Sequence, residues 1–141
     1  MAGVITHSSE ETIAFGRSLA EILAPPQLVL LTGPLGAGKT TLVKGIAEGF
    51  GAAPEEDVTS PTFTLIHEDR GPAVSVFHID LYRIDTEREL ETLGLQDLFE
   101  PHHVLLVEWG DKFPRLLRQC DAAIVLAPLG ENDRQITIRQ S

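Results

Sequence analysis

Hydrophobic and polar positions follow two different patterns along the chain. Short apolar runs are typical of buried strands, whereas apolar residues that recur every three or four positions are typical of amphipathic helices. Strands are predicted at 4–6, 27–32, 63–67, 74–79, 104–107, 122–126 and 135–138. Helices are predicted behind Ser8 as far as Leu23, over 40–50 and over 86–93. Because strands and helices alternate, we expect a layered α/β domain.

The segments between these elements indicate how they connect. The runs on either side of the polar segment 68–72 predict an antiparallel hairpin, and the last two runs of the chain predict another. The segment 52–59 is polar and predicts a solvated loop. Ser8 and Glu11 have the spacing of a capping box at the start of the first helix. We therefore expect a mixed central sheet that includes antiparallel hairpins.

One glycine-rich segment carries the strongest chemical signal. Residues Gly33 to Thr40 read GPLGAGKT and match the phosphate-loop pattern GxxxxGK[ST] in full. They follow a predicted strand and open a predicted helix, where backbone N–H groups can surround a phosphate at the positive end of the helix dipole. A glycine-rich turn without a ligand is the alternative interpretation. We expect nucleotide contacts from Gly33, Leu35, Gly36, Ala37, Gly38, Lys39, Thr40 and Thr41.

Two side chains of this loop have distinct expected roles. The Lys39 ammonium group would bind the β- and γ-phosphates, and the Thr40 hydroxyl would bind the magnesium ion that bridges them. The expected ligand is a nucleoside triphosphate with Mg²⁺. The chain of 141 residues fits one domain. We expect a single-domain, three-layer P-loop NTPase-like fold over residues 1–141.

The charge of the chain limits its partners. It has 11 Lys and Arg residues against 21 Asp and Glu residues, a formal net charge of −10. Such a surface repels a nucleic-acid backbone, so broad nucleic-acid binding by the chain alone is not expected. A basic partner protein, or a ligand whose charge is carried by magnesium, suits this surface better.

The sequence also indicates a cellular compartment. The single cysteine, Cys120, has no second thiol with which to form an internal disulfide. The first residues lack the charged start and apolar core of a signal peptide, and no apolar run approaches membrane-spanning length. We expect a cytoplasmic protein without a membrane partner.

Three polar residues outside the phosphate loop are candidates for metal binding, nucleotide-dependent switching or orientation of the attacking water at the γ-phosphate. Glu108 ends an apolar strand, where a carboxylate can hold magnesium or polarise the attacking water, with a solvated turn residue as the alternative. Thr62 follows Pro61 on a segment that could act as a nucleotide-dependent switch, with an ordinary turn as the alternative. Asp80, at a strand end, could orient water or pair with Lys39.

Other residues of these segments favour structural interpretations. Arg83 is expected to form a salt bridge rather than to stabilise a transition state. Trp109 is expected in the core rather than stacked on a base. His67 and His78 lie on predicted strands and do not form a metal-binding pattern.

Four motifs together resemble a known family. GPLGAGKTT at 33–41, SPT at 60–62, HIDLYR at 78–83 and VEW at 107–109 resemble, in order and spacing, the TsaE (YjeE) family of bacterial P-loop ATPases. The resemblance covers nearly the whole chain, and the DLYR and VEW segments are more particular to this family than the phosphate loop. It implies an ATP hydrolase, weak alone, that is needed for threonylcarbamoyl modification of adenosine 37 in tRNAs that read codons beginning with A.

The same resemblance implies partners and residue roles. TsaB and TsaD are the implied partner proteins, with TsaD carrying out the transfer, so that tRNA is acted on indirectly through the complex. The implied roles place Lys39 on the phosphates, Thr40 and Glu108 at magnesium, Thr62 on a switch loop and Asp80 among the residues required for ATP hydrolysis. Near the adenine the resemblance places Ser9 or Glu10 and the loop at Asp133 and Arg134.

Two other classes of function begin with the same loop. A small-molecule P-loop kinase needs an arginine-rich lid and an acceptor pocket, for which 141 residues leave little room. A nucleotide-gated protein-binding switch needs no catalysis. Its guanine-specific form normally carries an Asn-Lys-x-Asp segment, which this sequence lacks.

Overall fold

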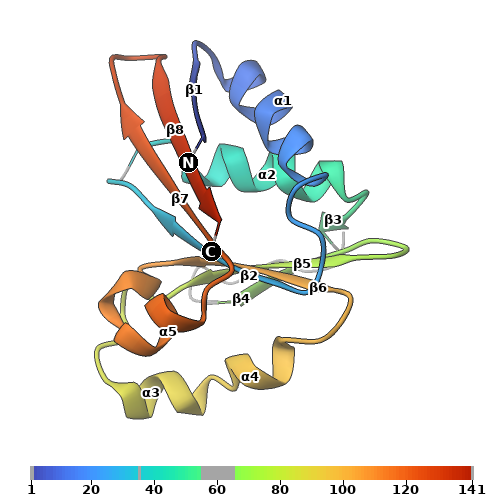
Figure 1. Cartoon of the computed structure of the whole chain (residues 1–141), viewed down its shortest axis with the longest axis vertical. Coiled ribbons are helices and arrows are strands. Elements are labelled where there is room, and N and C mark those ends of the chain that lie inside the picture. The colour runs from blue at the N-terminus through green and yellow to red at the C-terminus, as the bar shows by residue number, and fades with distance from the viewer. Residues whose placement is uncertain (1, 35, 55–65, 141) are drawn as a thin grey trace.

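One mixed sheet forms the centre of the fold (Figure 1). The computed structural model describes residues 2–34, 36–54 and 66–140, so the predicted site residues Leu35 and Thr62 lie outside the described residues. Within that part, the sheet has eight strands in the order β1-β8-β7-β2-β6-β5-β4-β3. The strands are β1 (Ala2–Thr6), β2 (Gln27–Thr32), β3 (Ala53–Pro54), β4 (Ile66–Arg70), β5 (Ser75–Asp80), β6 (His103–Glu108), β7 (Ala122–Pro128) and β8 (Arg134–Gln140).

Strand direction separates the middle of the sheet from its margins. The inner strands β7, β2, β6 and β5 are parallel, whereas β1, β8, β4 and β3 pair antiparallel with their neighbours. Both predicted hairpins are confirmed, as β4-β5 and β7-β8. In the register of the inner strands, Glu108 lies opposite Leu31 on one side and Asp80 on the other. The carboxyl ends of three parallel strands therefore meet at one edge of the sheet, the usual place for a ligand in an open α/β fold.

Helices cover both faces of the sheet, as Figure 1 shows. One face carries α1 (Ser9–Leu19) and α2 (Lys39–Gly49), and the other carries α3 (Glu87–Thr92), α4 (Leu95–Leu98), the 3-10 helix η1 (Gly110–Lys112) and α5 (Pro114–Gln119). Each helical layer encloses its own hydrophobic cluster against the sheet. The predicted three-layer α/β fold with a mixed central sheet is confirmed.

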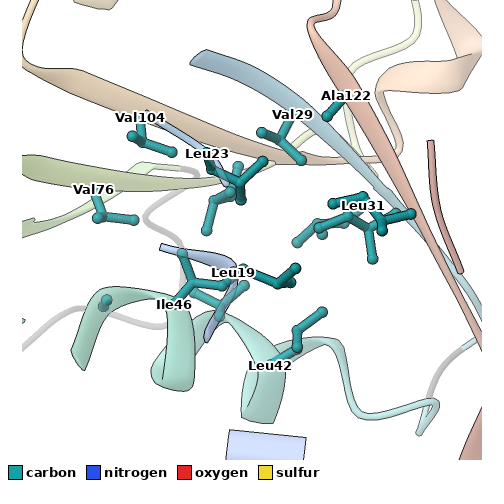
Figure 2. Packing of buried hydrophobic residues seen from close by; sticks show 14 of the residues in the cluster. Leu19, Leu23, Val29, Leu31, Leu42, Ile46, Val76, Val104 and Ala122 are labelled. Atoms are coloured by element: carbon teal, nitrogen blue, oxygen red, sulfur yellow. The ribbon is translucent and has the colours of Figure 1, made fainter. Parts of the chain in front are cut away.

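Strand β2 shows why the predicted strands were apolar runs rather than alternating patterns. Val29 and Leu31 face the α1–α2 layer, whereas Leu28 and Leu30 face the opposite layer. Figure 2 shows Leu31 directed toward Leu42 on α2. Because successive side chains of a strand point to opposite faces, a strand covered on both sides needs apolar residues at every position.

Glycines allow α1 and α2 to pack unusually close together. A Cβ atom built on Gly45 would lie 2.3 Å from the Ile13 carbonyl oxygen, and one built on Gly49 would lie 2.6 Å from the Arg17 carbonyl oxygen. Both contacts join residues with the same separation in sequence, so the two helices run in parallel. This packing brings the start of α1, with Ser9, to the start of α2.

Substitution of Gly45 tests this contact. We expect Gly45→Ala to lower the free energy of unfolding by about 2 kcal/mol, because the overpacking cost of up to about 3 kcal/mol exceeds the gain of about 1 kcal/mol from alanine's helix propensity. Chemical denaturation measures the change. Gly130→Ala is the matched control, since nothing lies within 4 Å of a Cβ atom at Gly130. Equal stability of the two variants would contradict the close packing.

The structure corrects several predicted boundaries. Strand β4 continues to Arg70, so most of the predicted turn at 68–72 belongs to the strand. The predicted loop at 52–59 begins with β3, which pairs with β4, because backbone pairing at a sheet margin does not require an apolar side-chain pattern. The sequence also left α4, η1 and α5 unpredicted, since helices this short show little periodicity. No helix in the described residues is long and apolar enough to cross a membrane.

Candidate nucleotide-binding site

The phosphate loop connects the end of β2 to the start of α2. Gly36 and Gly38 have φ angles of +82° and +95°, in the left-handed region that favours glycine. Gly38 is the N-cap of α2 and supplies no side-chain hydrogen bond, so the first amides of the helix are not capped by a side chain at this position. Such amides, at the positive end of the helix dipole, suit an anion. The Ala37 amide donates to the Pro34 carbonyl, so its phosphate contact stays a prediction.

Lys39 folds back across this loop. Its ammonium Nζ donates a hydrogen bond of 2.7 Å to the Gly33 carbonyl and lies 3.1 Å from Glu108 Oε1. The side chain is only 9% exposed. A buried ammonium group needs partners of this kind, because desolvation of an unpaired charge is costly. The structure therefore brings together two predicted site residues, Lys39 and Glu108, from α2 and β6.

Glu108 has a second partner that the sequence analysis missed. Its Oε2 lies 2.5 Å from Nε2 of His78, on the neighbouring strand β5. Burial alone would raise the pKa of Glu108, but the hydrogen bond and charge of His78, together with those of Lys39, outweigh burial and hold this pKa below its ordinary value. The carboxylate is thus ionised at neutral pH. The signal for His78 was present in the HIDLYR motif, where it lies two positions before Asp80 and hence on the same strand face.

Asp80 occupies the end of β5, opposite Glu108 in the strand register. Its Oδ1 accepts a hydrogen bond of 3.0 Å from the Tyr82 amide. The expected alternative of an Asp80–Lys39 pair is replaced in the structure by the Glu108–Lys39 pair, because α2 directs Lys39 over the end of β6. Asp80 nevertheless lines the same cleft as Lys39.

Trp109 does not lie in the core, contrary to expectation. It is 37% exposed, and its φ angle of +65° turns the chain out of β6 directly after Glu108. The indole ring contacts the Tyr82 ring at a centroid distance of 5.2 Å and lies 5.4 Å from Lys39 Nζ. Tyr82, 62% exposed, is a further cleft residue that the sequence analysis did not select.

These residues surround one cleft with a volume of about 710 Å³. The lining residues are Gly36, Gly38, Lys39, Thr40, Thr41, Asp80, Tyr82, Glu108, Trp109 and Arg134. Ser9 lies in an adjoining small pocket that it shares with Thr41 and Arg134. Arg134 extends to the phosphate loop, where its Nη2 donates a hydrogen bond of 3.3 Å to the Gly36 carbonyl. Apart from Leu35 and Thr62, the predicted site residues thus gather at and around one edge of the sheet.

The oxygen donors of the cleft fit magnesium. Mg²⁺ prefers carboxylate, hydroxyl and phosphate oxygens and is usually held by one or two protein groups plus substrate phosphates. Thr40 and the ionised Glu108 carboxylate both line the cleft and supply donors of this kind. In the described part of the chain, no group of three or more His, Cys, Asp or Glu side chains could hold a metal ion. One hydroxyl and one carboxylate, as Thr40 and Glu108 supply them, suit a metal that is bound together with phosphate oxygens.

Comparisons with known proteins identify the family of the chain. The family model of the threonylcarbamoyl adenosine biosynthesis protein TsaE matches residues 6–136. The tRNA threonylcarbamoyladenosine biosynthesis protein TsaE of Bacillus subtilis is 41% identical over 132 residues, which cover 94% of this chain and 81% of the relative. The protein of the same name from Treponema pallidum is 33% identical over 95% of this chain and 97% of the relative.

A solved structure extends the likeness to three dimensions. The crystal structure of YdiB from Bacillus subtilis superposes with a TM-score of 0.77 at 34% sequence identity. The match covers 99% of this chain and 84% of YdiB. The chain therefore belongs to the TsaE family of threonylcarbamoyl adenosine biosynthesis proteins.

Proposed function

We propose that this chain is a magnesium-dependent ATPase that acts with TsaB and TsaD in the threonylcarbamoyl modification of adenosine 37 in tRNA. Family membership supports the pathway. The observation that carries the nucleotide part is the ion pair between Lys39 and Glu108 beside the phosphate loop. A P-loop lysine within 3.1 Å of a strand-end carboxylate combines a phosphate-binding cation with a candidate metal ligand.

Nucleotide binding would exchange the partners of Lys39. Its Nζ now contacts the Gly33 carbonyl and the Glu108 carboxylate, and phosphate oxygens are stronger acceptors than a neutral carbonyl. When Lys39 turns to the β- and γ-phosphates, Oε1 of Glu108 loses its partner. The same movement thus binds the phosphates and frees a carboxylate oxygen.

The freed oxygen and the Thr40 hydroxyl would hold Mg²⁺. The ion supplies charge neutralisation between the β- and γ-phosphates when it is bound. Asp80 would orient the attacking water, since one of its oxygens accepts from the Tyr82 amide while the residue lines the cleft. Ser9 and Arg134 line the small pocket beside the phosphate loop and would contact the adenine. The roles of Leu35 and Thr62 stay predictions.

The acidic surface suits work through partner proteins. With a formal charge of −10, the chain is poorly suited to bind tRNA directly. We propose that it associates with and leaves a TsaB–TsaD complex in the cytoplasm, and that ATP hydrolysis resets the assembly. We propose that hydrolysis by the chain alone is slow and that the partner proteins accelerate it.

ATP binding and turnover by the purified chain test this proposal. Calorimetry with ATP and GTP, with and without Mg²⁺, should show magnesium-dependent binding that favours ATP. Phosphate release should be slow for the chain alone and faster when TsaB and TsaD are added together. No ATP binding, or turnover that the partners leave unchanged, would contradict the proposal. ADP release that depends on a small metabolite as phosphate acceptor would instead identify a kinase.

A further inference from the structure

His78 and Glu108 form a short contact between two neighbouring strands. Nε2 of His78 lies 2.5 Å from Oε2 of Glu108, and the two side chains are 19% and 11% exposed. In the register of the parallel strands β5 and β6, His78 lies opposite Leu106, two residues before Glu108. Both side chains therefore project from the same sheet face, the one covered by α2.

The direction of this hydrogen bond follows from the carboxylate. The Glu108 carboxylate already accepts from the Lys39 ammonium group at Oε1, so it acts as an acceptor at Oε2 too, and Nε2 of His78 donates the hydrogen bond. The contact occupies Oε2, and Lys39 contacts the other oxygen, Oε1. Each carboxylate oxygen thus has its own partner, one from the sheet and one from the phosphate loop.

The two partners differ in what binding can do to them. Lys39 lies on the phosphate loop and has phosphates as alternative acceptors, whereas His78 is fixed on an inner strand of the sheet. The terminal torsion of a glutamate is broad, so a carboxylate without a fixed contact can rotate. With Oε2 held by His78, Oε1 keeps its direction toward Lys39 and the cleft after Lys39 has left.

We propose that His78 is a positioning residue that presents Oε1 of Glu108 to magnesium at the nucleotide site. The inference rests on the proposed function and adds to it a residue that does not itself touch nucleotide or metal. Groups that orient metal ligands from behind are worth about 10- to 100-fold in metal affinity or activity. Loss of the His78 donor should therefore weaken magnesium binding at the nucleotide site and leave phosphate binding by the loop unchanged.

The lone tryptophan of the chain supplies a direct readout. Trp109 lines the cleft and lies 5.4 Å from Lys39 Nζ, so its fluorescence should report the nucleotide as it binds. Titration of Mg²⁺ at fixed ATP gives the magnesium concentration for half-maximal change, and titration of ATP in EDTA gives metal-free binding. We expect His78→Ala to raise the magnesium concentration needed for half-maximal change about 10- to 100-fold. The affinity for ATP in EDTA should stay within about twofold of that of the unsubstituted protein.

Matched variants separate positioning from packing. His78→Gln keeps a donor near the position of Nε2 and should restore most of the magnesium response, whereas His78→Leu fills the space without a donor and should resemble His78→Ala. His67→Ala is the control, because His67 is the cross-strand neighbour of His78, on β4, one strand further from Glu108. Circular dichroism and thermal melting check the fold, and His78→Leu replaces His78→Ala if the latter does not fold.

The outcomes also distinguish this inference from the proposed function. An unchanged magnesium response in folded His78→Ala or His78→Leu would overturn the positioning role, as would a His78→Gln variant no better than His78→Leu. The positioning role would also be overturned if His67→Ala raised the magnesium concentration for half-maximal change as much as His78→Ala does. If the unsubstituted chain binds ATP with no dependence on magnesium, the proposed function itself fails.

Discussion

Lys39→Ala is expected to remove most nucleotide binding and all measurable ATP turnover. The ammonium group is buried beside the phosphate loop. It contacts the Gly33 carbonyl and the Glu108 carboxylate there. A hydrogen bond to a charged group contributes about 1.5–3 kcal/mol, so its loss should weaken ATP binding about 10- to 150-fold. Turnover should fall by a further factor of about 100 or more, because charge on the γ-phosphate is left unbalanced.

Lys44→Ala is the matched control for this variant. Lys44 lies on the same helix but is exposed, and the same side chain is removed. Calorimetry with ATP and magnesium measures the affinity, and phosphate release with the partner proteins measures turnover. If Lys39→Ala and Lys44→Ala bind ATP equally well, the phosphate loop does not hold the nucleotide in the proposed way.

The fold was largely predictable because its inner strands are buried on both faces. The run at 27–32 matches β2 to the residue, and the phosphate-loop pattern correctly placed a helix, α2, directly after it. The predicted helix at 86–93 corresponds to α3, with Thr86 as its N-cap. Prediction failed where side-chain pattern carries little information. Strand β3 pairs at the sheet margin through its backbone, and α4 spans a single turn.

The site was predictable residue by residue but not in its contacts. Lys39 and Thr40 were selected from the phosphate-loop pattern, and Asp80 and Glu108 because each ends a strand. The structure places all four on one cleft. Which carboxylate meets Lys39 depends on strand order, since β6 lies directly beside β2 and β5 lies one strand further away. The contact between His78 and Glu108 depends on the same order. The outward turn of Trp109 depends on one positive φ angle. Such an angle is uncommon at a residue other than glycine, so the sequence does not predict it.

Glu108→Gln is expected to separate ATP binding from ATP turnover. Glutamine keeps the shape of the side chain but removes the charge that would hold magnesium and that now pairs with Lys39. Magnesium-dependent turnover should fall about 100- to 1,000-fold. ATP binding in EDTA should be unchanged or tighter, because Lys39 no longer has a carboxylate partner to leave and the phosphates no longer meet a nearby negative charge. Glu21→Gln, at an exposed position, is the control and should change neither quantity.

The same variant should alter how stability depends on pH. The pKa of Glu108 is held below its ordinary value of 4.5 in the folded chain, so its ionised form stabilises the fold at pH values above 4.5. This contribution is lost as the pH falls through the lowered pKa, where the folded chain must also take up the proton. Urea denaturation should therefore show Glu108→Gln less stable than the unsubstituted chain at pH 7, with the difference shrinking below pH 4.5. A difference that stayed constant down to pH 3 would mean that Glu108 is not stabilised as a charged partner of Lys39 and His78, and that its place at the metal needs another explanation.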